Sequence, residues 1–269
     1  MGGAGGPIDS SRTDGRGDFT LRAGHPDTTA VYVVSSWYDG IAYFSEPVTV
    51  SRPRTSLRPL PVYDTTSTGP GVRVERRLLT VAKQKPDGAR DVLELLELKN
   101  PGSKTRIAAD TLQPTWTGAI PVEAIQFQVA QGDLSPQAVT QRGDTVAVFG
   151  PIPPGDAKQL SYAYVIPGGA ARVAVPIDQP TAEVDLLVED TVATVTAARL
   201  DTLGVQEIER RRFARYRARA VPAGAVVTIA FSVAPAFRAE SLVPVVVIAV
   251  AAVLAAGFVV ALRKKTSDV

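Results

Sequence analysis

The densest set of charged side chains is the run RRRFARYRAR at residues 210–219. Within it Arg215, Arg217 and Arg219 occupy every second position. Because side chains on a β-strand alternate between its two faces, a strand here would project three guanidinium groups from one face. Such a face could simply be solvated and discourage edge pairing. It could also contact anionic headgroups or an acidic protein, so these arginines are our candidate lipid or partner contacts.

Aromatic residues form a second group of chemical interest near the start of the chain. Trp37 and Tyr38 are followed closely by Tyr43 and Phe44. Exposed aromatic rings can stack on sugars, whereas alternation along strands equally predicts that they pack in a core or at an edge. Trp37 and Tyr38 are therefore our candidate ligand-stacking residues, and glycan or ligand binding is the alternative function.

The remaining polar groups do not suggest an enzyme. The chain has one histidine, His25, in a Gly-His-Pro-Asp loop, and no cysteine. A histidine-based triad or a thiolate metal site therefore lacks its parts. A group of carboxylates lacks the spaced loop of a calcium site, and we expect it to form a solvated strand face: Glu183, Asp185, Glu189 and Asp190. We predict no catalytic residue, no metal site and no cofactor, and the net charge of +2 gives no reason to expect nucleic acid binding.

Period-two alternation of apolar residues indicates the elements that would position these groups. It persists from residue 72 to residue 233, for example at Leu160, Tyr162, Tyr164 and Ile166. Turn signals such as Pro153-Pro154-Gly155 separate the runs. Residues 91–99 (DVLELLELK) could form a helix by composition, but their short length and the Asn-Pro-Gly stop favour a strand. The pattern predicts an antiparallel β-sandwich over residues 72–234.

The N-terminal segment indicates a smaller β-domain. Asp39-Gly40 between two β-rich runs is a strong hairpin signal. The pattern Thr13-Asp14-x-x-Gly17-x-Phe19, followed by a Tyr-x-Val run at Tyr32, resembles the carboxypeptidase regulatory-like, or Cna-B-type, small β-sandwich. The resemblance covers about 40 residues and implies a scaffold without a ligand site, of which residues 1–51 would form only the second half. A half sandwich would leave one strand edge and one core face open.

A looser likeness extends over the larger domain. Pro153-Pro154-Gly155 and the Tyr-x-Tyr-x-x-Pro run that starts at Tyr162 resemble bacterial envelope proteins in which a regulatory-like domain precedes a second β-domain. The likeness implies an exported, anchored protein and supplies no active site.

The last apolar segment predicts a membrane anchor. Residues 241–262 contain no charged side chain, and at about 1.5 Å per residue a helix of this length spans the roughly 30 Å hydrocarbon core. Arg263, Lys264 and Lys265 follow at once, which favours a cytoplasmic tail at residues 263–269 and an extracytoplasmic bulk. The first residues, MGGAGGP, do not resemble a signal peptide. Two interpretations stay open, a start that lacks the signal peptide and first strands, or a tail-anchored protein.

The sequence as a whole predicts a mainly β protein: a partial small β-sandwich and a larger antiparallel β-sandwich, followed by a single C-terminal transmembrane helix. We place a linker at residues 52–71 and a juxtamembrane linker at residues 235–240. The expected function is that of a non-catalytic envelope protein, a structural or protein-interaction module. Its expected partners are the lipid bilayer and another envelope protein, with no nucleic acid.

Overall fold

We describe a computed structural model of the chain over residues 6–50 and 54–231. It is mainly β and divides into two compact units between Val62 and Tyr63. The boundary falls within the segment that the sequence predicted as a linker. The predicted anchor at residues 241–262 lies outside the described residues. Within the described part of the chain, no helix has the length and apolarity needed to cross a membrane.

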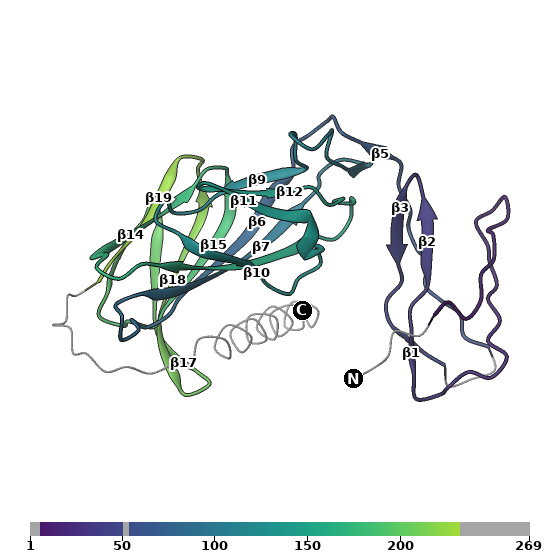
Figure 1. The fold of residues 1–269 in the computed structure, drawn as a ribbon, viewed down its shortest axis with the longest axis horizontal. Coiled ribbons are helices and arrows are strands. Elements are labelled where there is room, and N and C mark those ends of the chain that lie inside the picture. Colours follow the sequence, from purple (N-terminus) through teal and green to yellow (C-terminus); the bar gives the residue numbers. More distant parts are fainter. Residues whose placement is uncertain (1–5, 51–53, 232–269) are drawn as a thin grey trace. The chain divides into compact units, whose positions relative to one another are not determined.

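The N-terminal unit contains two small antiparallel sheets. Strand β1 (Val31–Tyr32) pairs with β4 (Val48–Thr49), and β2 (Ser35–Tyr38) pairs with β3 (Ile41–Phe44) as a hairpin (Figure 1). Asp39 and Gly40 connect β2 to β3 with φ angles of 47° and 76°, the positive values that a two-residue hairpin turn needs at both central positions. The hairpin predicted from Asp39-Gly40 is confirmed.

This unit buries almost nothing. Tyr43 is the one buried apolar side chain among residues 6–50 and 54–62. Ile8, Val31 and Val33 are all more than half exposed, at 61%, 61% and 53%. Packing between the two small sheets therefore leaves most large apolar side chains of the unit in contact with solvent.

The C-terminal unit is built on a seven-stranded sheet with the order β10-β13-β7-β6-β15-β18-β17. Its strands are β6 (Arg73–Val81), β7 (Arg90–Lys99), β10 (Ile125–Val129), β13 (Lys158–Ile166), β15 (Thr181–Val188), β17 (Leu200–Ile208) and β18 (Arg211–Val221). Residues 91–99 are part of β7, so the strand predicted there is confirmed.

One pair in this sheet departs from the antiparallel prediction. Strands β6 and β15 are parallel neighbours, with Leu79 opposite Leu186. Between β6 and β15 the chain passes through strands of the smaller sheets, the last of which is β14. A crossover of this kind allows β6 and β15 to be parallel neighbours, whereas a tight hairpin does not. Alternation along a strand indicates that it is half-buried and carries no information about the direction of its neighbour, so the sequence could not distinguish the two arrangements.

Two three-stranded sheets form the other layer of the sandwich (Figure 1). Their strands, in the orders β11-β12-β9 and β14-β19-β16, are β9 (Trp116–Ala119), β11 (Val139–Arg142), β12 (Thr145–Val148), β14 (Arg172–Ile177), β16 (Thr194–Thr196) and β19 (Ala225–Ala230). A short pair, β5 (Thr65–Thr66) with β8 (Thr105–Arg106), and one 3-10 turn (Pro136–Ala138) complete the described elements.

A single hydrophobic core lies between the layers. It joins side chains of the large sheet, such as Leu79 and Leu186, to side chains of the smaller sheets, such as Val146, Val175 and Ile229. All five are at most 1% exposed. Leu186 and Ile229 come from period-two runs, so the alternation predicted their inward faces, whereas in β6 a register shift between Val74 and Arg76 brings Leu79 inward and leaves Leu78 on the opposite face.

Candidate functional site

The large sheet carries polar clusters on both of its faces, and the first lies inside the core. Arg77 of β6 and Glu94 of β7 point inward among apolar neighbours and are 4% and 0% exposed. The Arg77 Nε donates to Glu94 Oε2 at 2.6 Å, and its Nη1 donates to the Pro176 carbonyl at 2.8 Å. Removing a charge from water is costly, so a buried ion pair is tolerated only when the remaining donors and acceptors are also paired.

Two tyrosines of β13 complete this buried cluster. The Tyr164 hydroxyl donates to Glu94 Oε1 at 2.7 Å, and the Tyr162 hydroxyl lies 3.3 Å from Glu94 Oε2. Burial and the Glu94 carboxylate raise the pKa of both tyrosines well above the usual value of 10, so both stay protonated donors. Burial alone lowers the pKa of Arg77, but the adjacent Glu94 carboxylate outweighs it and the pKa is raised. Both carboxylate oxygens thus accept hydrogen bonds, Oε1 from Tyr164 and Oε2 from Arg77 and Tyr162.

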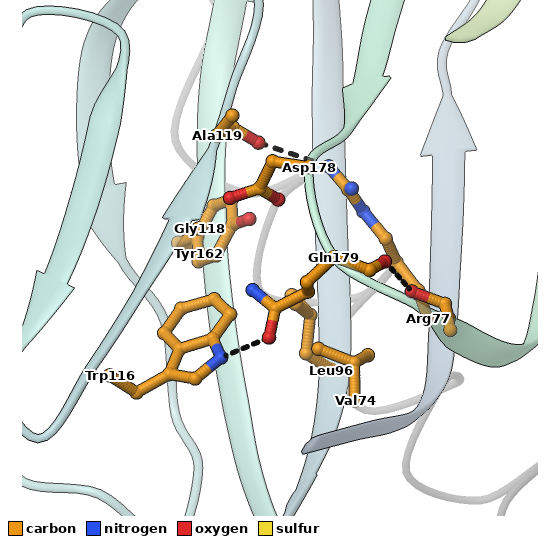
Figure 2. A pocket seen from close by; sticks show the side chains of 10 residues that line it. Val74, Arg77, Leu96, Trp116, Gly118, Ala119, Tyr162, Asp178 and Gln179 are labelled. Atoms are coloured by element: carbon orange, nitrogen blue, oxygen red, sulfur yellow. Dashed lines mark hydrogen bonds between the residues drawn. The ribbon is translucent and has the colours of Figure 1, made fainter. Parts of the chain in front are cut away.

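Figure 2 shows the depression between the layers that this cluster borders. The Trp116 indole Nε1 donates to Gln179 Oε1 at 2.9 Å, and Gln179 Nε2 donates to the Thr117 carbonyl at 2.9 Å. Gln179 thereby ties β9 to the segment between β14 and β15. Trp116 lines this depression but is only 5% exposed, so its ring is mostly buried in the core.

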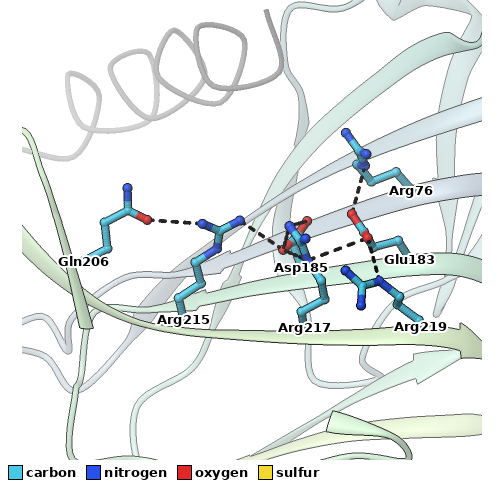
Figure 3. Close-up of polar contacts among 7 residues, drawn as sticks. All are labelled: Arg76, Glu183, Asp185, Gln206, Arg215, Arg217 and Arg219. Atoms are coloured by element: carbon cyan, nitrogen blue, oxygen red, sulfur yellow. Dashed lines mark hydrogen bonds and ion pairs between the residues drawn. The ribbon is translucent and has the colours of Figure 1, made fainter. Parts of the chain in front are cut away.

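The second cluster lies on the opposite face of the large sheet and includes all three candidate arginines (Figure 3). Strand β15 pairs with β18 so that Asp185 faces Arg217 and Glu183 faces Arg219. Directly opposite residues share a face, which places Arg215, Arg217 and Arg219 together as the alternation predicted. Arg76 of β6 joins them from the other side of β15. We call these four arginines, with Glu183 and Asp185, the arginine ladder.

Each carboxylate of the arginine ladder receives several guanidinium groups. Arg217 binds Asp185 with two hydrogen bonds, of 2.9 and 3.1 Å, and Arg215 lies 3.5 Å from the same carboxylate. Glu183 lies 3.4 Å from Arg76, 3.4 Å from Arg219 and 3.7 Å from Arg217. Two further carboxylates lie on this face, Glu97 of β7 directly opposite Arg76 and Asp201 of β17 directly opposite Arg217.

The carboxylates do not form the solvated face that the sequence predicted. Asp185 is 3% exposed, because β18 and β6 flank β15 and Arg215 and Arg217 of β18 cover its carboxylate. Glu189 accepts two hydrogen bonds from Arg211, at 2.8 and 2.5 Å, and Asp190 accepts one from Arg90 at 3.1 Å. Burial alone would raise the pKa of Glu189, but the bonds from Arg211 and the Lys83 backbone hold it below the usual value. The period-two Glu-x-Asp and Arg-x-Arg-x-Arg runs were the available signal for cross-strand pairing.

The structure does not bring the two candidate stacking residues together. Trp37 and Tyr38 are consecutive on β2 and so lie on opposite faces of the hairpin. Trp37 shares its face with Phe44, and the two side chains are 76% and 65% exposed. A ring stacked on Trp37 would therefore meet Phe44 rather than Tyr38.

The lone histidine lies in an exposed bend at the surface, as expected for a turn residue. Within residues 6–50 and 54–231, no group of three or more histidine, aspartate or glutamate side chains is placed to hold a metal ion.

No protein-family model matches the chain, and comparison with curated proteins gives no match either. Solved structures give distant likenesses. A mutant M1 zinc metallopeptidase from Deinococcus radiodurans, bound to a Tyr-Ser-Ala substrate, has a TM-score of 0.39 at 12% identity. The match covers 60% of this chain and 42% of the metallopeptidase chain.

A candidate nutrient binding protein from Legionella pneumophila has a TM-score of 0.38 at 11% identity, over 62% of this chain and 70% of its own. This chain spans about two fifths of the length of the metallopeptidase it matches. With TM-scores below 0.5 and identities this low, neither likeness assigns a function.

Proposed function

We propose that the chain is a non-catalytic interaction module, held at a membrane by residues 241–262 with its bulk on the extracytoplasmic side. Its β-sandwich presents the arginine ladder to an acidic segment of another envelope protein. The gathering of four guanidinium groups around Glu183 and Asp185 on one sheet face is the observation that carries this proposal.

The exposure of the individual arginines supports a binding role for part of the ladder. Arg219 and Arg76 stand at its outer end, with side chains 65% and 32% exposed, whereas Arg215 and Arg217 are each 18% exposed. The two inner arginines hold the sheet face together, and the two outer ones can add a carboxylate from a partner. A guanidinium group binds a carboxylate through two parallel hydrogen bonds, which gives the contact orientation as well as charge.

The same positive charge would also attract anionic headgroups, the other partner that the sequence allowed. A protein partner is favoured because the ladder's arginines are already fixed by Glu183 and Asp185 in one geometry. A fixed, partly buried array of guanidinium groups suits a protein carboxylate that is held in one orientation. Lipid headgroups are usually bound by long, flexible Lys and Arg side chains.

The test uses the full chain in nanodiscs of neutral phosphatidylcholine. A fluorescent twelve-residue glutamate-rich peptide serves as the probe, and its affinity is measured by anisotropy at low and high salt. The double variant Arg76→Gln/Arg219→Gln should weaken binding by about tenfold at low salt, because the two guanidinium groups together are worth on the order of 1.4 kcal/mol. The matched control, Arg12→Gln/Arg172→Gln, removes the same charge from two other exposed positions.

Equal losses of peptide affinity in the two double variants would mean that only net charge matters, and would contradict the proposal. A second arm replaces the peptide by vesicles that contain anionic phosphatidylserine. If the vesicles bind in a ladder-dependent manner and the peptide does not, the partner is lipid and the proposed acidic protein segment is wrong.

A further inference from the structure

The described part of the sandwich ends at a residue that is firmly held, Phe231. It is 8% exposed, and its backbone N–H donates to the Ala171 carbonyl at 2.9 Å. The Arg90 guanidinium lies over its ring, 3.7 Å from the centroid. Arg90 is itself buried and donates to Asp190 at 3.1 Å and to the Ala82 carbonyl at 3.5 Å. We call Phe231, Arg90 and Asp190 the exit clasp. A cation over an aromatic face is held more strongly when both are removed from water, so the exit clasp fixes the point from which residues 232–240 continue.

The exit clasp lies at one end of the large sheet. Arg90 is the first residue of β7 and is opposite Ile166, the last residue of β13. Strands β6 and β15 run parallel to each other and end at the same level, at Val81 and Val188. The turn between β6 and β7, at residues 82–89, therefore lies beyond the sheet at this end. We call it the clasp end of the sandwich.

The exposed arginines of the ladder lie toward the other end of the same sheet. Arg76 is opposite Glu97 of β7 on one side and Glu183 of β15 on the other, and Arg219 is opposite Glu183. Glu97 follows Arg90 by seven residues along β7. At about 3.3 Å per residue, these two arginines therefore lie about 23 Å from the exit clasp along the strands.

The chain between the exit clasp and the predicted anchor is short. Residues 232–240 are nine residues, which reach at most about 30 Å when fully extended. If the outer arginines of the ladder were at the membrane, this segment would have to run back along the sandwich for about 23 Å, which is most of its full reach. No such extension is needed if the clasp end faces the bilayer.

We propose that the exit clasp holds the sandwich upright on the membrane, with its clasp end at the bilayer and with Arg76 and Arg219 turned away from it. This arrangement rests on the proposed function, because it requires residues 241–262 to be a membrane anchor. It also narrows the class of partner. Headgroups of the same membrane lie too far below the outer arginines to bind them. The acidic segment belongs to a neighbouring extracytoplasmic domain that rises at least about 20 Å above the bilayer.

The absence of cysteine from the chain allows a dye to be attached at one position at a time. Gln84→Cys labels the turn at the clasp end, and Ser103→Cys labels the loop that follows β7 at the other end; both positions are exposed. The full chain is placed in nanodiscs of neutral phosphatidylcholine that contain a headgroup-linked acceptor dye. Because β7 separates the two labels by about 30 Å, energy transfer should be at least about twofold greater from Gln84→Cys than from Ser103→Cys.

Equal transfer from the two labels would mean that the sandwich lies on its side, and greater transfer from Ser103→Cys would mean that it is inverted. Either result overturns the proposed orientation. Flotation of the labelled chain with phosphatidylcholine vesicles tests the anchor separately. A chain that does not float contradicts the proposed function and this orientation with it, whereas a chain that floats but shows no difference in transfer contradicts the orientation alone.

The role of the exit clasp and of the short segment after it is tested by an insertion. About twenty Gly and Ser residues added after Pro235 form a flexible coil that frees the sandwich to turn over, so the difference in transfer between the two labels should be lost. The matched control places the same insertion after Thr55, ahead of the sandwich, and should leave the difference unchanged. A difference that survives the insertion after Pro235 would mean that another contact orients the sandwich, and would contradict the role of the exit clasp.

Discussion

The two units of this chain are both rich in β-strands, but they bury their apolar side chains to very different extents. The C-terminal sandwich buries one continuous core and pairs even its buried charges, as Arg77 and Glu94 demonstrate. Among its described residues the N-terminal unit buries a single apolar side chain, Tyr43, and leaves Trp37 and Phe44 in solvent. Burial of apolar surface is the main stabilising contribution in folding, so the sandwich receives far more of this contribution than the N-terminal unit does.

The largest expected effect is in the buried cluster of the sandwich. Glu94→Ala leaves the Arg77 guanidinium buried without its counter-charge, and removal of one partner of a buried ion pair costs about 3–5 kcal/mol. The free energy of unfolding, measured with denaturant on the full chain, should fall by that amount. Glu75→Gln, an exposed glutamate on the neighbouring strand, should change it by less than about 0.5 kcal/mol. A similar small change in both variants would mean that Arg77 and Glu94 contribute no net stability.

A smaller loss is expected on the opposite face of the same sheet. Asp185→Asn keeps the size of the side chain but removes the charge that Arg215 and Arg217 share. Hydrogen bonds to charged groups contribute about 1.5–3 kcal/mol, and the loss should lie at the lower end because Glu183 remains close to Arg217. Denaturant unfolding of Asp185→Asn and Glu94→Ala side by side tests which face of the sheet contributes more to the free energy of unfolding. A larger loss for Asp185→Asn would contradict the expected order.

Glu189 gives the sandwich a dependence on pH. Its pKa in the folded chain lies below the unfolded value of 4.5, because Arg211 and the Lys83 backbone stabilise its carboxylate. The stability from this group is therefore fully present above pH 4.5 and is lost as the pH falls through the lower folded pKa. Glu189→Gln should lower the free energy of unfolding by about 1 kcal/mol at neutral pH and flatten its decline in acid. An unchanged slope below pH 4.5 in the variant would assign the acid sensitivity to other carboxylates.

The smallest effect is expected in the N-terminal unit. Phe44→Ser removes an aromatic side chain that is 65% exposed, so the main unfolding transition should move by less than about 0.5 kcal/mol. The comparable truncation in the sandwich, Leu79→Ala, should cost about 2–5 kcal/mol because it opens a cavity in the core. Equal losses would mean that the two units fold as one cooperative body and would remove the contrast between them.

Much of the fold follows from local patterns in the sequence. Alternation identified the inward faces of β13 and β15, and Asp39-Gly40 identified the hairpin turn, because both signals come from residues adjacent in the chain. The candidate site was predicted only in part. The sequence placed Arg215, Arg217 and Arg219 on one face, but it treated Glu183 and Asp185 as solvated and paired Trp37 with Tyr38.

The sequence by itself therefore determined which side chains share a face along regular strands such as β13 and β15, since period two is a property of each strand alone. Tertiary structure decided which strands become neighbours. The parallel contact of β6 with β15 brings Arg76 to Glu183 across more than 100 residues of chain, and the pairing of β15 with β18 brings Asp185 to Arg217. Local pattern cannot encode such contacts, because they depend on the order in which the layers close around the shared core.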